Sequence, residues 1–230
     1  MFKYVLDSSA EPKVIGVKDG GSQIVLSDKN QNDLTLKKFL WPKNGWPDLK
    51  RDNLSKYESE LNFNLKKQAK ITDFLYHSPY IHIVGIFSEN FINLLQKFKM
   101  NEHIVFKEVF VFRNDEKIQE RYFLIQQPIL NKEVDWSNTF FYKPLQRDIN
   151  SNEICFKFKD ESHYIGSVSS IRLSRISFNK AEIYDYDFVS SLTDDFVSDR
   201  LAKAIEEANF TNIVLKNLDS INCSEVILHE

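Results

Sequence analysis

The 230-residue chain is poor in the residues on which several classes of protein depend. Its only cysteines are Cys155 and Cys223, and neither has a histidine or another cysteine nearby at metal-ligand spacing. A disulfide framework or a zinc site needs more such residues, so we expect two reduced, partly buried thiols. No apolar run approaches the roughly 18 to 20 residues that cross a bilayer, and the first residues turn acidic and polar too soon for a signal peptide. The sequence therefore predicts a cytoplasmic protein with no membrane partner.

The sequence also lacks the short motifs of common enzymes. There is no G-x-S-x-G nucleophile elbow, no P-loop and no G-x-G-x-x-G, and the chain has only six glycines. The five histidines are isolated, without the i, i+4 pairing or the nearby cysteine and glutamate of a metal site: His77, His82, His103, His163 and His229. We expect no catalytic residue, no metal and no cofactor, and hence a protein that is not an enzyme.

Hydrophobic residues make up 42% of the chain and charged residues 27%, and 19 phenylalanines are far too many for a disordered protein. The net charge is only −3, but residues 181–230 carry 11 acidic and 3 basic groups, a net charge of −8. This distribution disfavours nucleic acid as a partner of this end and favours a cationic protein.

A helix-then-strand pattern occurs twice, at residues 86–109 and 196–218. Each copy places a serine and an acid, at Ser88 and at Ser198, before an amphipathic run, and each closes with Ile-Val-apolar-Lys at 104–107 or 213–216. Serine is a preferred N-cap, and an acid next to it suits the helix dipole. The pattern predicts two serine-capped helices with buried faces, in a scaffold role. The predicted buried positions are Phe91, Leu94, Leu95 and Phe98 in the first and Leu201, Ala204, Ile205 and Ala208 in the second.

Most of the remaining ordered segments are predicted to be strands. The strand at 13–17 and the one at 24–26 are expected to form a hairpin through Asp19-Gly20-Gly21, and a second hairpin joins 104–112 to 118–126, with Pro128 ending it. Further strands are expected at 2–6, 59–65, 80–87, 154–158 and 213–218. We predict an α+β fold with mainly antiparallel sheets and two similar helix-strand units packed on them. Residues 27–58 and 132–180 receive no clear assignment.

The predicted domain organisation has an N-terminal lobe at 1–131, a connector at 132–152 and a C-terminal lobe at 153–230. A single domain is the alternative. The oligomeric state is left open by the sequence.

The candidate partner-binding residues are four aspartates before the second helix: Asp185, Asp187, Asp194 and Asp195. The approach to Ser88 is apolar by contrast, so this acidic run distinguishes the two copies. The simpler interpretation is that these are solvated loop acids. Two tryptophans in Trp-Pro pairs, Trp41 and Trp46, are further candidates, because aromatic residues dominate binding hot spots; the alternative is a small satellite core beneath the loop.

The stretch IYDYDFVSSLTDDF, followed by VSDRLxxAIEEA and then IVLK, resembles the C-terminal part of the eleventh immunity-protein family of bacterial polymorphic toxin systems. The resemblance extends loosely over Thr72 to Leu218. It implies a cytoplasmic antidote that binds a cognate toxin and blocks it by stoichiometric occlusion, with no catalysis of its own. The acidic quarter of the chain would suit a basic toxin.

Two other classes of function stay open at this point. A small-ligand-binding or regulatory module would use Trp41 and Trp46. A metal-dependent hydrolase built on the same aspartates is the third possibility, because paired carboxylates bind hard cations.

Overall fold

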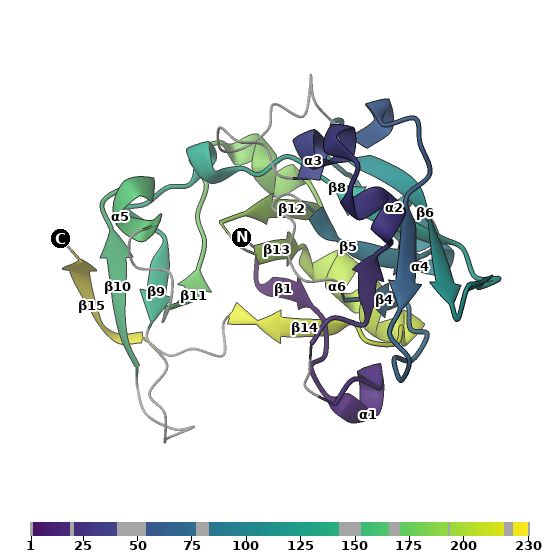
Figure 1. Cartoon of the computed structure of the whole chain (residues 1–230). Coiled ribbons are helices and arrows are strands. Elements are labelled where there is room, and N and C mark those ends of the chain that lie inside the picture. Colours follow the sequence, from purple (N-terminus) through teal and green to yellow (C-terminus); the bar gives the residue numbers. More distant parts are fainter. Residues whose placement is uncertain are drawn as a thin grey trace.

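The computed structural model describes residues 2–18, 21–40, 54–76, 83–142, 153–165, 171–192, 194–218 and 223–229. It is a mixed α/β protein, mainly β, with mostly antiparallel sheets and few helices (Figure 1). Within the described residues, no helix combines the length and apolar character required to span a membrane.

The largest sheet is a curled, seven-stranded mixed sheet in the described chain, with the order β2-β3-β6-β8-β5-β4 and β7 paired to β6. Only the β3–β6 pairing is parallel. The strands are β2 (Ile24–Leu26), β3 (Asn62–Leu65), β4 (Phe74–Leu75), β5 (Ile83–Ser88), β6 (Val105–Arg113), β7 (Glu116–Lys117) and β8 (Tyr122–Gln126).

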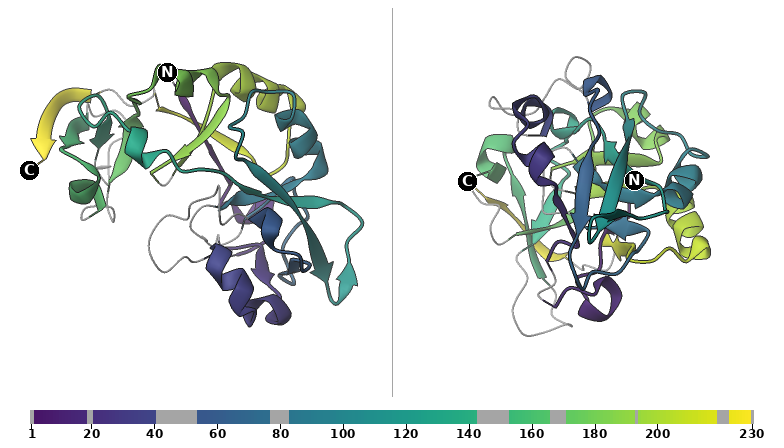
Figure 2. Two further views of the ribbon diagram at one scale, coloured as in Figure 1. Left: turned by 90° about the horizontal axis from the view of Figure 1, so that it is seen from above. Right: turned by 45° about the vertical axis from the view of Figure 1, so that its right-hand side comes forward.

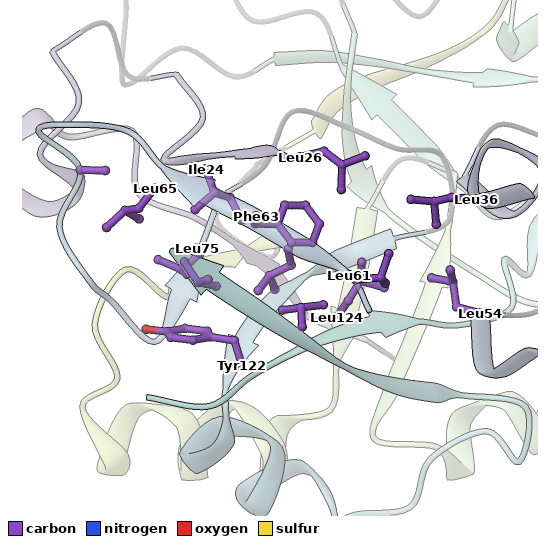
Figure 3. Packing of buried hydrophobic residues seen from close by; sticks show 14 of the residues in the cluster. Ile24, Leu26, Leu36, Leu54, Leu61, Phe63, Leu65, Leu75, Tyr122 and Leu124 are labelled. Carbon is purple, nitrogen blue, oxygen red and sulfur yellow. The ribbon is translucent and has the colours of Figure 1, made fainter. Parts of the chain in front are cut away.

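Hydrophobic side chains of this sheet and of three short helices meet in one cluster (Figure 3). The helices are α1 (Pro12–Ile15), α3 (Leu34–Leu40) and the 3-10 turn η1 (Leu54–Lys56). Helix α2 (Asp28–Gln31) is polar; it lies, like α3 and η1, in the segment that the sequence left unassigned. Leu61, Phe63 and Leu65 are all buried, as expected from their alternation with polar residues.

A second sheet, β12-β13-β1-β14, is antiparallel throughout and joins the two ends of the chain. Its strands are β1 (Tyr4–Asp7), β12 (Phe188–Ser191), β13 (Asp194–Val197) and β14 (Val214–Asn217). The 3-10 turn η4 (Ala181–Asp185) leads into β12. Because β1 lies between β13 and β14, the first residues of the chain fill the centre of a sheet built otherwise from its last quarter.

The third sheet has the order β11-β9-β10-β15 and carries the C-terminal strand. Its strands are β9 (Phe140–Tyr142), β10 (Glu153–Phe158), β11 (Arg172–Arg175) and β15 (Cys223–His229); the 3-10 turn η2 (Asn131–Glu133) precedes it and helix α5 (Glu161–Ile165) follows β10. The division of the chain into two lobes at 132–152 stays a prediction.

Cys155 in β10 is fully buried and is part of a disulfide, which corrects the expectation of two reduced thiols. The other cysteine, Cys223, begins β15, which pairs in parallel with β10. Sequence spacing cannot report such a pairing, because the two strands are brought together only by the tertiary fold. Cytoplasmic localisation stays a prediction.

The two serine-capped helices are α4 (Glu89–Leu95) and α6 (Asp199–Ala208). Ser88 Oγ accepts a hydrogen bond from the Phe91 amide at 3.4 Å, and Ser198 Oγ accepts one from the Leu201 amide at 3.2 Å. The helices lie beside each other (Figure 2) and bury side chains in one shared cluster. Their buried residues are Phe91, Ile92 and Leu95 in α4 and Leu201, Ala202 and Ile205 in α6. Ala208, expected in the buried face, is exposed.

The strand order β4-β5-β8-β6 around α4 is the same as the order β12-β13-β1-β14 around α6. All pairings within both sets are antiparallel, and each helix connects the second strand of its set to the fourth. The register places Val105, Phe106 and Lys107 of β6 where Val214, Leu215 and Lys216 stand in β14. The alignment of the two sequence copies at these residues is therefore the alignment that the strands adopt. The sets differ in chain order: β8 follows β6, whereas its counterpart β1 opens the chain.

The predicted hairpin of residues 13–17 and 24–26 is wrong. Residues Pro12–Ile15 form the short helix α1, with Pro12 in its first turn and Gly16 as a left-handed C-cap at φ 77°. A Cβ on Gly16 would lie 2.2 Å from the Gln68 carbonyl oxygen, so this position requires glycine. Strand β2 exists but pairs with β3. Of the predicted turn, Asp19 and Gly20 lie outside the described residues.

The second predicted hairpin is confirmed. Strands β6 and β8 are antiparallel, Asn114 and Asp115 form the turn after β6 with positive φ, and β8 ends at Gln126, two residues before Pro128.

Candidate functional site

Asp187, one of the four predicted partner-binding aspartates, is buried at 1% exposure immediately before β12. Its carboxylate accepts hydrogen bonds from Ser198 Oγ at 2.5 Å, from the Lys99 amide at 2.8 Å and from both Nε and Nη2 of Arg200. Burial raises the pKa of Asp187, but the bonds from Arg200, Ser198 and Lys99 outweigh it and hold the pKa below its usual value. The carboxylate is thus fully used inside the protein, where it fixes the start of α6.

Asp73 occupies the corresponding place before β4 and α4. Its carboxylate accepts from Ser88 Oγ at 2.7 Å and from the amide and hydroxyl of Thr211, each at 2.8 Å. The backbone repeats the arrangement, because Ser88 N donates to Asp73 O at 2.8 Å and Ser198 N donates to Asp187 O at 2.9 Å.

The two aspartates connect the two helix sets reciprocally. Asp73, next to the start of α4, binds Thr211, which follows α6; Asp187, next to the start of α6, binds Lys99, which follows α4. Each carboxylate therefore holds the start of one helix and the loop after the other. We name this pair of contacts the aspartate clamps.

Asp185 has the surface position expected of a partner-binding residue, with 67% of its side chain exposed and an ion pair to Lys99 at 3.5 Å. It lies at a surface cleft of about 460 Å³ that also contains Phe2, Tyr184 and Asp199.

The Asp195 carboxylate lies beside two polar side chains, Ser190 of β12 and Gln127, which follows β8. Ser190 Oγ donates to Asp195 Oδ1 and receives a hydrogen bond from Gln127, whose amide also reaches Asp195 Oδ1 at 3.5 Å. Burial raises the pKa of Asp195 to about 7, against the lowering effect of the Ser190 bond.

Asp194 points from the same strand into a different environment. It lines a cleft of about 340 Å³ between the second and third sheets, together with Arg172 and Leu173 of β11, Tyr142 of β9, Lys216 and Asn217 of β14, and Val5 and Leu218. Among the described residues, its carboxylate has no hydrogen-bond or ion-pair partner, and burial raises its pKa to about 6. Within the described ranges, the Arg172 side chain donates one hydrogen bond, from Nη1 to the Ile171 carbonyl at 3.1 Å, and Lys216 pairs with Asp7.

The counterparts of Asp194 and Asp195 in the first set are apolar. Since Leu6 pairs with Asp195 and Ile125 with Gly85, the register aligns Asp195 with Gly85. Sequence order then matches Asp194 with Val84, which lies at a register shift between Ile83 and Gly85. In the same alignment, Asp7 of β1 corresponds to Gln126 of β8. The second set thus carries three carboxylates at a strand end where the first set carries none.

The sequence singled out Asp194 and Asp195 but missed their neighbours Asp7, Arg172 and Lys216. A local pattern cannot associate these residues, because β1, β11, β13 and β14 come from distant parts of the chain. The repeat itself held one usable signal, since aligning Ser88 with Ser198 places Val84 and Gly85 against Asp194 and Asp195.

The other predicted residues, Trp41 and Trp46, lie outside the described residues. In the described part of the chain, no three histidine, cysteine, aspartate or glutamate side chains gather as a possible metal site. No protein-family model matches the chain, and no curated protein matches it.

Proposed function

We propose that this protein is an immunity protein that binds a basic toxin and blocks it by occlusion, without catalysis. The observation that carries the proposal is an acidic surface on η4 and α6, formed by exposed Glu182, Asp185, Asp199, Glu206 and Glu207. We call these five residues the acidic surface. Such a surface accelerates association with a cationic partner and selects against anionic ones.

Two of these five carboxylates form ion pairs with described residues, and both pairs are exposed. Asp185 pairs with Lys99 at 3.5 Å and Glu207 with Lys203 at 3.9 Å, but all four side chains are more than half exposed. Exposed pairs of this kind contribute little energy, so a partner can compete for the carboxylates. Asp187 does not belong to the acidic surface, because Arg200, Ser198 and Lys99 already occupy it.

We also infer that the two strand-helix sets are two copies of one scaffold, and that the aspartate clamps make them a rigid support. A preorganised support favours tight occlusion because little conformational freedom is lost on binding. On this view most of the acidic surface belongs to the second copy alone: aligning Ser88 with Ser198 places Gln96 and Lys97 where α6 has Glu206 and Glu207, whereas Glu89 matches Asp199.

The test is to search the neighbouring reading frames for a large secreted protein and to produce the chain together with the C-terminal domain of that protein. We expect restored growth of cells that make the toxic domain and a stable one-to-one complex. Changing Glu182, Asp185, Glu206 and Glu207 together to lysine should weaken binding by roughly 100-fold, mainly through the association rate at low salt.

The matched control changes four exposed glutamates elsewhere to lysine, Glu11, Glu58, Glu60 and Glu116, with the same change in net charge. It should retain most of the affinity. Equal losses in both variants would show that only net charge matters, and the absence of protection by the unmodified chain would overturn the proposal.

The cleft beside Asp194 supports a second candidate function, a small-ligand-binding module. The described residues that line this cleft do not include Trp41 or Trp46.

A further inference from the structure

The cleft between the second and third sheets has the composition of a ligand site. Its volume of about 340 Å³ lies within the range of small-molecule sites in proteins. One wall comes from β1, β13 and β14 and the other from β9 and β11, so two independent sheets shape it. About half of its lining is apolar, and the other half is polar or charged: Arg172, Asp194, Lys216 and Asn217. Ligand sites likewise combine apolar walls with convergent polar groups.

The apolar part of the cleft is ordered and largely buried. Val5 is 5% exposed, and Leu173 and Leu218 are each 8% exposed, so their side chains belong to the core between the sheets. They leave an apolar wall at the base of the cleft against which an aliphatic or aromatic group would lose contact with water.

The charged groups of the cleft have unused bonding capacity. The Arg172 guanidinium has five N–H donors and makes one hydrogen bond with the described residues, to the carbonyl of its own neighbour Ile171. The Asp194 carboxylate is half-buried and accepts no hydrogen bond from any described residue. A desolvated carboxylate without a partner is costly, and a ligand that donates to it removes that cost.

The comparison of the two scaffold copies indicates that the fold itself does not need this carboxylate. Val84 precedes Gly85 in the first copy as Asp194 precedes Asp195 in the second, although the β5–β8 register shifts between Ile83 and Gly85. Lys107, the counterpart of Lys216, donates to the Tyr57 carbonyl at 2.6 Å, whereas Lys216 reaches Asp7 at the edge of the cleft. The polar groups of the cleft are therefore additions to the common scaffold.

We propose that this cleft binds an α-carboxylate that carries an adjacent N–H donor and an apolar side chain. The carboxylate is bound by Arg172 in a forked contact with Lys216 nearby, the N–H group donates to Asp194, and the side chain packs on Val5, Leu173 and Leu218. A free apolar amino acid and the C-terminal residue of a peptide share this chemistry. The inference is independent of the proposed toxin binding, which uses the acidic surface.

The experiment measures binding to the full chain by isothermal titration calorimetry at neutral pH and low salt. The probes are L-leucine, N-acetyl-alanyl-leucine and the carboxamide of the same dipeptide. Saturable binding of leucine identifies a free amino acid as the ligand, and saturable binding of the dipeptide acid identifies a chain terminus. The carboxamide should bind at least 10-fold more weakly than the acid, because a charge-assisted hydrogen-bond pair is lost.

Two variants report on the two ends of the ligand. Arg172→Gln should weaken binding of the acid about 10-fold or more while leaving the carboxamide unchanged, and Asp194→Asn should weaken whichever probe the wild type binds. Arg175→Gln is the matched control, because Arg175 lies on the same strand but stacks over Phe140 and does not line the cleft. Thermal melts of all three variants establish that they are folded.

Three results would overturn the proposal: no saturable binding of any probe up to millimolar concentration, equal binding of acid and carboxamide, or equal effects of Arg172→Gln and Arg175→Gln. None of these bears on toxin neutralisation, so the two proposals fail or survive separately.

Discussion

The two strand-helix sets share their strand order, their pairing and their serine caps, yet they end differently. In the first set the strand that leads into the helix runs through Val84 and Gly85 over an apolar core; in the second it runs through Asp194 and Asp195. One set shows what the fold requires, and the other shows what has been added to it. This internal comparison separates structural acids such as Asp187 from acids that are available for binding.

The largest loss of stability is expected when one of the two aspartate clamps is removed, and the two single variants can be compared. Asp187→Ala removes the acceptor of Ser198, Arg200 and the Lys99 amide, and should lower the free energy of unfolding by about 2–4 kcal/mol. Asp73→Ala removes the acceptor of the neutral donors Ser88 and Thr211 near the surface and should cost about 1–2 kcal/mol. Urea denaturation measures both changes, and a larger loss for Asp73→Ala would contradict the assignment of Asp187 as the stronger clamp.

A second test concerns Gly85, the counterpart of Asp195. A Cβ at Gly85 would lie 2.4 Å from the ring of Phe74, which is itself stacked on Phe87 with ring centroids 4.4 Å apart. Gly85→Ala should therefore destabilise the protein by about 1–3 kcal/mol through overpacking.

The control for Gly85→Ala is Asp195→Ala, because the second set already accommodates a side chain at this position. Because alanine is smaller than aspartate, Asp195→Ala should cause no overpacking. If thermal denaturation gives a wild-type midpoint for Gly85→Ala, the close approach of Phe74 is not a constraint.

The smallest effect is expected from Asp195→Asn, and it depends on pH. The pKa of Asp195 is raised to about 7 in the folded protein, above the usual value of about 3.9 in an unfolded chain. The folded state therefore binds more protons than the unfolded state between about pH 4 and pH 7, and the wild type loses stability as the pH rises through this window.

Asparagine removes this titration and still accepts the hydrogen bond of Ser190. The variant should gain about 1–2 kcal/mol relative to the wild type between pH 5 and pH 8, as measured by urea denaturation at both values. Asp194 titrates in the same window, with a pKa raised to about 6, so the slope of the wild type will not vanish completely in the variant. An identical stability difference at both pH values would show that Asp195 does not titrate in this range.

Local features of the fold were predicted well from the sequence because their causes are local. Ser88 and Ser198 cap their helices through contacts three residues along the chain, and the turn at Asn114-Asp115 needs only residues that tolerate positive φ. Residues Lys13–Val17 were predicted wrongly as a strand, because Pro12 and Gly16 set a helical turn that outweighs the β-branched residues between them.

Only part of the candidate site could be predicted from the sequence, because most of its contacts join residues that are distant in the chain. The density of acids drew attention to Asp185, Asp187, Asp194 and Asp195, but composition cannot tell a clamped, buried carboxylate from a free one. Arg200, the second residue of α6, neutralises Asp187, whereas the cleft residues beside Asp194, such as Arg172 and Lys216, come from other strands.

By itself, the sequence determined the two serine-capped helices, the strand that follows each of them and the acidity of the last quarter, because caps, hydrophobic periodicity and charge are properties of neighbouring residues. Only the tertiary structure decided that β1 completes the second set, that Asp73 and Asp187 lock the two sets together, and that Asp194 faces Arg172 across a cleft. Those relations rest on strand pairing and packing between distant segments, which no pattern of neighbouring residues specifies.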